Sequence, residues 1–433
     1  MSLSVAVIGA GPAGFYATDA LTRKAPGARI DLIERLPTPY GLIRSGVAPD
    51  HQTTKNVTRV FDRTATKEGV RYLGNVEVGR DVSLTELQEI YDAVVLAFGA
   101  ERDRKLGIPG EDKAGVLGSM EFVGWYNGHP DFTAIAPDLS VATVAVIGNG
   151  NVAIDVARIL ARSEAELAAT DIADYALAAL KQSAVRDVHV CGRRGPNQAS
   201  FTNVELREMG ELERAVALCH PDQVPAEIDP GLEGKERRLK EANLKCFQAF
   251  AEADRNAKPI GVHFEFFASP VEVLGAGRVE GLRLERTRLE DGRAVGSGEF
   301  FDLACGLVVT CVGYECRSLE GVALDRGKVV NDDGRVAPGL YAVGWAKRGP
   351  TGTIGTNRPD AQDVVARLIA DLGDGQGKPG PDGLSALLRE RQVRVVSYQD
   401  WDKINAAEVA RAAPSAPRRK LVRVADMLAA LGP

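Results

Sequence analysis

Three glycines near the start of the chain have the spacing Gly-x-Gly-x-x-Gly, which can hold a phosphate group. Gly9, Gly11 and Gly14 follow the apolar run 4–8, a predicted strand, and precede a segment with helical spacing. In this pattern the first glycine makes a tight turn, the second lets the backbone approach a pyrophosphate, and the third lets the helix pack on the strand. Glu34 ends the next predicted strand, 20 residues after Gly14, where an acid can bind ribose hydroxyls. The segment therefore predicts a dinucleotide site, with an ordinary glycine turn as the alternative.

A second turn of the same kind lies about 140 residues further along the chain. Gly148, Gly150 and Ala153 repeat the spacing between an apolar run and a predicted helix, and alanine is an accepted third residue. The next predicted strand ends in the pair Arg193-Arg194 instead of an acid, and it comes later than usual because a helix-like segment is inserted. Two arginines suit a 2′-phosphate, which favours NADP over NAD. The alternative is a solvated arginine pair.

Length and composition limit the number of domains and the kinds of partner that the chain can have. The chain has 433 residues, enough for two to four domains, with 45% hydrophobic and 26% charged residues. A net charge of −6 does not suggest a nucleic-acid partner. No apolar run is long enough to span a membrane and no signal peptide is recognised, so a cytoplasmic location is expected. The six cysteines show no metal or cluster spacing.

The elements expected around the turns alternate between strands and helices, which indicates an α/β chain with two Rossmann-like dinucleotide-binding folds. Asp291-Gly292 predicts a hairpin turn. The other segments to be compared with the structure are helices over 164–182, 204–216 and 235–254, β-like runs over 262–274, 279–289 and 300–312, and a strand over 339–345.

Several motifs together resemble those of the adrenodoxin-reductase-like ferredoxin–NADP+ reductases. Besides the two glycine turns, they are the run from Tyr40 to His51 (Tyr-Gly-Leu-Ile-Arg-Ser-Gly-Val-Ala-Pro-Asp-His), the pair Gly344-Trp345, and the loop from Gly349 to Gly355. The resemblance extends over nearly the whole chain. It implies FAD in the first fold and NADP(H) in the second, with the NADP domain inserted into the FAD domain as in glutathione reductase.

The domain boundaries that this resemblance implies are 1–100 for the first part of the FAD domain, 101–318 for the NADP domain and 319–433 for the second part of the FAD domain. It also implies an enzyme that passes electrons from NADPH through FAD to a ferredoxin-type acidic iron–sulfur protein. The chain has no cysteines for a fused cluster, so that protein would be a separate molecule. The alternatives are another acceptor, such as a quinone or a flavodoxin, and a flavin-binding sensor or scaffold.

The resemblance also implies site residues. The residues expected to contact FAD are Ala13, Glu34, Leu42 and Val78. Those expected to contact NADP are Asn149, Gly150, Asn151, Val152, Arg193, Arg194 and Glu205. Arg104 is expected near the cofactors, and the residues expected to border the flavin are Trp345, Gly352, Thr353 and Ile354. The backbone N–H groups of 352–354 would face negative charge developing on the reduced flavin.

Two further roles concern protons and the protein partner. His51 is a candidate for proton handling near the flavin, with Glu208 as its partner; a structural histidine is the alternative. Because ferredoxins are usually acidic, a basic surface is expected, and the candidates are Arg207, Arg237 and Arg238. The alternative for the last two is an ordinary salt-bridged helix.

Overall fold

The computed structural model describes residues 2–432, and the chain forms two compact units. The first unit contains the residues up to Val47, then His51–Arg102, and everything from Gly313 onward. The second contains Ala48–Asp50 and Asp103–Val312. The first unit is therefore built from both ends of the chain.

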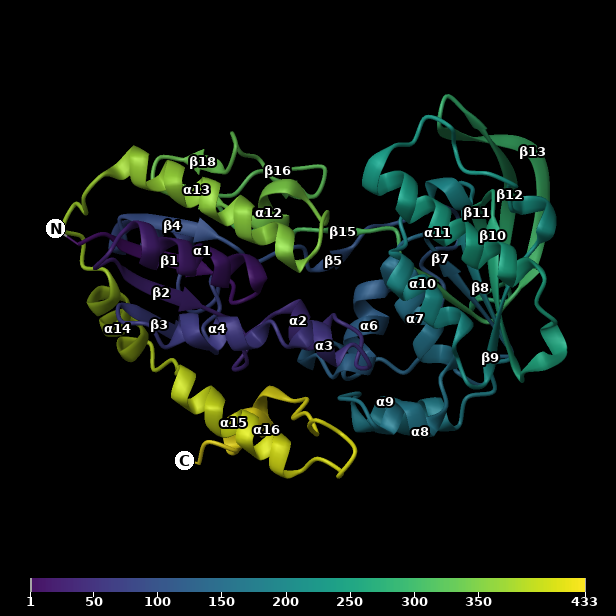
Figure 1. Ribbon diagram of the computed structural model, residues 1–433. Coiled ribbons are helices and arrows are strands. Elements are labelled where there is room, and N and C mark those ends of the chain that lie inside the picture. Colours follow the sequence, from purple (N-terminus) through teal and green to yellow (C-terminus); the bar gives the residue numbers. More distant parts are fainter. Residues whose placement is uncertain (1, 433) are drawn as a thin grey trace. The chain divides into compact units, whose positions relative to one another are not determined.

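A six-stranded sheet forms the centre of the first unit, in the order β18-β19-β4-β1-β2-β3 (Figure 1). All neighbours are parallel except β18 and β19. The strands are β1 (Ser4–Ile8), β2 (Arg29–Ile33), β3 (Val70–Leu73), β4 (Ala93–Leu96), β18 (Arg335–Ala337) and β19 (Leu340–Ala342). The order reverses beside β1, and ligands bind at such a switch point in open α/β sheets.

Helices from distant parts of the sequence cover this sheet. α1 (Pro12–Lys24) packs against α13 (Asn357–Leu372), and both contribute to the buried core with Phe15 and Val364. The other helices of the unit are α2 (Leu42–Ser45), α3 (Gln52–Lys55), α4 (Thr58–Ala65), α5 (Leu84–Ile90), α12 (Gly344–Arg348), α14 (Pro381–Glu390), α15 (Tyr398–Ala410) and α16 (Val424–Ala429). Two short strands, β16 (Leu324–Asp325) and β17 (Lys328–Val329), pair with each other as a separate antiparallel sheet.

The second unit has its own parallel sheet, in the order β6-β14-β7-β8-β10-β9. Its strands are β6 (Val116–Gly118), β7 (Thr143–Ile147), β8 (Asp187–Gly192), β9 (Ala215–Cys219), β10 (Ile260–Phe266) and β14 (Leu307–Thr310). An antiparallel sheet comprises β11 (Ala268–Leu274), β12 (Gly281–Glu290) and β13 (Arg293–Ala304). The helices are α6 (Ser119–Asn127), α7 (Asn151–Ala161), α8 (Glu164–Ala168), α9 (Asp174–Lys181), α10 (Asn203–Gly210) and α11 (Gly234–Ala251). β5 (Arg102–Asp103) and β15 (Tyr314–Glu315) lie where the chain passes from one unit to the other.

The predicted α/β class with two Rossmann-like sheets is confirmed, and so is the hairpin at Asp291-Gly292, where φ is 49° and 73°. The predicted helix over 204–216 is wrong in its second half, because α10 ends at Gly210 and 215–219 forms the parallel strand β9. The predicted strand 339–345 is also too long. It ends at Ala342, and Trp345 lies on the short helix α12.

Three other predicted segments are each divided into two elements. The helix over 164–182 is α8 and α9, and the run 300–312 is the end of β13 followed by β14. The run 262–274 is split between two sheets at Phe267, which has a φ of 53° and so turns the chain out of the strand. Tertiary packing decided these boundaries, since the residue types on both sides of each break are similar.

None of the helices within residues 2–432 is both long and apolar enough to cross a membrane. All six cysteines are free thiols.

Candidate functional site

The first glycine turn leaves no room for a side chain at Gly9 or at Gly14. Gly9 has a φ of 108°, and a Cβ there would lie 2.6 Å from the carbonyl oxygen of Ala97. A Cβ at Gly14 would lie 1.9 Å from the carbonyl oxygen of Gly9. Gly11 is the N-cap of α1, whose first turn of N–H groups points out of the helix beyond the end of β1. The turn is thus a backbone cradle at a helix N-terminus, which suits a pyrophosphate.

Glu34 lies beside this cradle, directly after β2. Its carboxylate accepts hydrogen bonds from the backbone N–H of Ala10 at 3.0 Å and of Leu36 at 3.2 Å. Burial raises the pKa of Glu34, and these two hydrogen bonds partly oppose that rise. The carboxyl group is therefore held in a fixed position beside the cradle.

The loop that begins at Tyr40 lies against the same cradle. The Tyr40 N–H donates to the carbonyl oxygen of Ala10 at 2.8 Å. Gly41 has a φ of 50°, and a Cβ there would lie 3.1 Å from the Cα of Gly11. Leu42 begins α2 directly after this contact, and Val78 is buried in the same unit.

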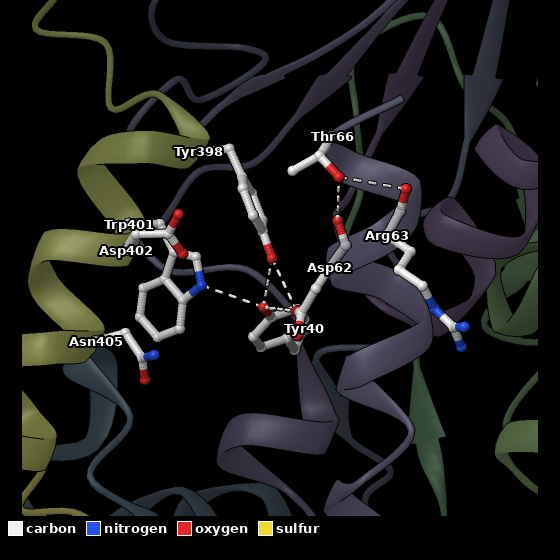
Figure 2. Close-up of a pocket in the computed structure, with 8 residues that line it drawn as sticks. All are labelled: Tyr40, Asp62, Arg63, Thr66, Tyr398, Trp401, Asp402 and Asn405. Carbon is white, nitrogen blue, oxygen red and sulfur yellow. Dashed lines mark hydrogen bonds between the residues drawn. The ribbon is translucent and has the colours of Figure 1, made fainter. Parts of the chain in front are cut away.

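The C-terminal segment supports this loop, as Figure 2 shows. The Tyr40 hydroxyl donates to Asp62 at 2.5 Å and accepts from the Trp401 indole N–H at 3.1 Å, while the Tyr398 hydroxyl also donates to Asp62, at 2.8 Å. These side chains line a pocket of about 260 Å³. Nearby, the fully buried carboxylate of Glu408 accepts a hydrogen bond from the Arg44 guanidinium at 2.9 Å.

Trp345 is placed near α1 by a glycine. A Cβ at Gly344, which has a φ of 64°, would lie 2.5 Å from the Cβ of Ala13. The Trp345 ring stacks on Tyr314 with centroids 5.9 Å apart, and its Nε1–H donates to the carbonyl oxygen of Thr351 at 3.2 Å. Tyr314 was not identified from the sequence, because stacking partners far apart in the chain leave no local pattern.

The loop that follows is open to solvent at its tip. Gly352 and Thr353 are exposed, and Gly352 has a φ of 83°. Ile354 begins the short 3₁₀ turn Ile354–Thr356, which leads directly into α13. The N–H groups of the loop therefore precede a helix N-terminus, as expected for a site that stabilises negative charge.

The second glycine turn repeats this design in the second unit. A Cβ at Gly148 would lie 2.4 Å from the carbonyl oxygen of Cys311, and Gly150 is the N-cap of α7. Asn151 and Val152 are the first residues of α7, and Ala153 is fully buried. Asn149 Oδ1 is buried and has no hydrogen-bond partner among the described residues. A buried acceptor without a donor is what a ligand site leaves when a ligand hydroxyl or N–H completes the bonding.

Arg193 and Arg194 follow β8 with both side chains exposed. Their backbone is fixed: the carbonyl oxygen of Arg193 accepts from the Thr287 hydroxyl at 2.8 Å, and that of Arg194 accepts from Asn149 Nδ2 at 3.4 Å. Arg194 is thereby tied to the second glycine turn, while both guanidinium groups face solvent.

Arg158 is a residue that sequence reasoning missed. It lies on α7 with no exposed surface, and its guanidinium contacts Asp50 at 2.7 Å, Asp155 at 2.7 Å and Glu205 at 3.1 Å. Glu208 lies 3.6 Å away. This buried cation fixes two acids of α10 that had been singled out, Glu205 and Glu208. An arginine in a helix whose other buried residues are apolar was the signal that could have found it.

The remaining candidates are distributed over both units. His51 is the N-cap of α3 in the first unit, and Arg104 is exposed in the second. The docking candidates lie on two helices. Arg207 is exposed on α10, and Arg237 and Arg238 are exposed near the start of α11.

Comparison with known proteins identifies the family. Residues 3–189 match the protein family described as "Pyridine nucleotide-disulphide oxidoreductase". A mitochondrial NADPH:adrenodoxin oxidoreductase from Arabidopsis thaliana is 43% identical over 459 residues, which covers 99% of this chain and 95% of that protein. The NADPH-ferredoxin reductase FprA of Mycobacterium tuberculosis is 41% identical to this chain, in an alignment that covers 98% of each protein.

The chain belongs to the adrenodoxin reductase/FprA family. A solved structure of Mycobacterium tuberculosis FprA in complex with NADPH matches it with a TM-score of 0.93 and 40% identity over 100% of both chains. The resemblance indicated by the sequence motifs is thus confirmed, and both dinucleotide-type sheets are those of the adrenodoxin reductase/FprA fold.

Proposed function

We propose that this chain is an FAD-dependent NADPH-ferredoxin reductase, which takes a hydride from NADPH and passes its two electrons singly to a separate ferredoxin-type acidic iron–sulfur protein. The proposal rests mainly on the presence of two glycine turns in this chain, the first beside Glu34 and the second beside Arg193-Arg194. Glu34, beside the first turn, would bind an adenosine ribose, and the arginine pair beside the second turn would bind a 2′-phosphate.

The first unit is proposed to bind FAD. The backbone cradle at Gly9–Gly14 fits a pyrophosphate because it lies at the N-terminus of α1, and a Cβ at Gly9 or Gly14 would collide with the backbone and distort it. Glu34 would then hold the ribose, and the loop after Tyr40 would cover the pyrophosphate. The other residues proposed to line this site are Ala13, Leu42, Val78, Trp345, Gly352, Thr353 and Ile354.

The second unit is proposed to bind NADP(H) at the N-terminus of α7. The unpartnered Asn149 Oδ1 fits this role, since it can accept from a ligand group. Arg193 and Arg194 would hold the 2′-phosphate through charge-assisted hydrogen bonds. The other residues proposed here are Gly150, Asn151, Val152 and Glu205, with Arg104 near the cofactors.

The chemistry requires a carrier between a two-electron donor and one-electron acceptors, and a bound flavin supplies it because it exchanges electrons in pairs or singly. This chain would provide orientation and electrostatics. The N–H groups of 352–354 would stabilise negative charge at the flavin edge. His51 and Glu208 are proposed to hold the proton that accompanies the transfer.

The identity of the flavin tests the cofactor assignment. The purified protein should be yellow and should release FAD on denaturation, because a pyrophosphate cradle with a ribose-binding acid needs the adenosine half of the molecule. Chromatography of the released flavin distinguishes FAD from FMN, and FMN alone would contradict the assignment.

Trp345 is expected to control the approach to the flavin. Trp345→Ala removes the ring that stacks on Tyr314 and the hydrogen bond to Thr351, so the loop should loosen while FAD stays bound. The rate of hydride transfer, measured by stopped flow under anaerobic conditions, should change. An unchanged rate would assign Trp345 to packing alone.

The docking surface is proposed to include Arg207, Arg237 and Arg238. Arg237 forms an ion pair with Glu241 at 2.8 Å, one helical turn further along α11. Arg207 and Arg238 make no ion pair with another residue in the described chain, 2–432, so their charges are available to an acidic partner. Charge complementarity raises association rates and is screened by salt, with a Debye length of about 10 Å at 0.1 M.

Reversing the charges at Arg207, Arg237 and Arg238 to Glu should therefore slow ferredoxin reduction at low ionic strength and reduce its salt dependence. NADPH-to-ferricyanide activity should be unaffected, since ferricyanide needs no docking surface. Both activities are measured against ionic strength. Loss of both would indicate damage to the NADP site or the fold, and loss of neither would place the docking surface elsewhere.

A further inference from the structure

The segment 199–203, here called the strap, lies across the second glycine turn. The backbone N–H and the hydroxyl of Ser200 both donate to the carbonyl oxygen of Asn149, each at 2.9 Å. The N–H of Thr202 donates to Asn151 Oδ1 at 2.9 Å. The strap thus holds the two asparagines of the turn, one on each side of the N-cap of α7.

Helix α11 in turn holds the strap. Asn243, which is 1% exposed, donates from Nδ2 to the carbonyl oxygen of Phe201 at 2.9 Å and accepts from Asn203 Nδ2 at 3.1 Å. The Lys240 ammonium, one turn earlier, donates to the carbonyl oxygen of Ala199. Burial lowers the pKa of Lys240, and Arg194 adds to this effect while Glu236 opposes it, so the ammonium lies within electrostatic range of Arg194.

The position of Asn243 is otherwise that of an apolar core residue. Phe201 is fully buried and packs on Phe247 and Phe264, with ring centroids 6.2 and 5.9 Å apart. Leu244 and Phe247 of the same helix are buried in this core. A buried amide surrounded by such residues is costly unless its hydrogen bonds are made. Here the Asn243 amide makes two hydrogen bonds, both to residues of the strap, Phe201 and Asn203.

We propose that Asn243 and Lys240 are positioning residues for the NADP(H) site: by fixing the strap from α11 they fix Asn149 and Asn151. The inference rests on the proposed function. Neither residue belongs to a dinucleotide motif, and both lie at least 87 residues after Ala153, the last residue of the turn that they position. The same helix carries Arg237 and Arg238, so the proposed docking surface and the proposed coenzyme site share one rigid support.

The test uses the complete FAD-loaded protein and NADP+ as the probe, titrated by the change in flavin absorbance. Asn243→Leu keeps the branching at Cγ but removes both hydrogen bonds, so the Kd for NADP+ should rise about 5- to 10-fold. Amide exchange at Ser200 and Thr202 should become faster, a readout that does not depend on the coenzyme. Asn127→Leu is the matched control, since Asn127 is equally buried, on α6 of the same unit.

A second pair of variants covers the case in which Asn243→Leu does not fold. Lys240→Met should raise the Kd for NADP+ about 3- to 5-fold, and Lys240→Arg, which keeps a donor, should restore it. Unchanged Kd values and unchanged exchange in the strap would overturn the inference. Failure of the unmodified protein to bind NADP+ would instead contradict the proposed function.

Discussion

Replacing Arg193 and Arg194 together by Ala is expected to raise the KM for NADPH by far more than the KM for NADH. Each charge-assisted hydrogen bond to a phosphate is worth roughly 1.5–3 kcal/mol, which corresponds to about 10- to 150-fold per arginine. NADH has no 2′-phosphate and should be nearly unaffected. Both side chains are exposed and only their backbone takes part in the fold, so the variant should remain stable.

Steady-state kinetics with both coenzymes provide the measurement, and the ratio of the two KM changes is the decisive quantity. Arg288→Ala is a suitable control, because Arg288 is an exposed arginine of the same unit whose ion pair is with Glu290. Equal weakening of NADPH and NADH in the double variant would show that the arginines do not read the 2′-phosphate.

The largest loss of stability is expected from Arg158→Met. This substitution leaves Asp50, Asp155 and Glu205 without their buried cation. Removing one partner from a buried ion-pair network typically costs about 3–5 kcal/mol. In a unit of this size that lowers the Tm by roughly 6–20 °C. The KM for NADPH should rise as well, since Glu205 loses the group that orients it.

The loss should depend on pH in a defined direction. Without the guanidinium the folded variant favours protonated carboxyls, so its destabilisation should be smaller near pH 5 and larger near pH 8. Thermal unfolding at several pH values measures this. Arg283→Met removes an exposed pair with Asp302 and should cost about 1 kcal/mol or less. An Arg158→Met variant as stable as this control would contradict the role assigned to the network.

The sequence predicted the parts of this molecule whose chemistry is local. A glycine turn between strand and helix has a backbone reason that is independent of the rest of the chain, and Gly9 and Gly148 lie in the turns expected of them. Glu34 was found because its distance from Gly14 is set by one helix and one strand. The family resemblance, carried by 40–51 and 344–355, was confirmed for the same reason: these segments have distinctive residues at fixed spacing.

What the sequence did not show depends on tertiary contacts. Whether the residues after Gly210 continue a helix or enter the sheet as β9 is decided by the free edge of β10, with which β9 pairs. In the sequence, Arg158 and Asn243 look like ordinary helical residues, because their partners are distant in the chain. The partner of Asn243, Phe201, lies 42 residues before it. The roles in proton handling proposed for His51 and Glu208 stay predictions.

The most direct test of the proposed function follows the flavin absorbance under anaerobic conditions. NADPH is added to the purified protein first, and an oxidised ferredoxin is added afterwards. The proposal predicts that NADPH bleaches the flavin band rapidly, and that ferredoxin then restores it while two ferredoxin molecules are reduced for each NADPH consumed. A band that bleaches slowly or not at all with NADPH, or that stays bleached after ferredoxin is added, would contradict the assignment as an NADPH-ferredoxin reductase.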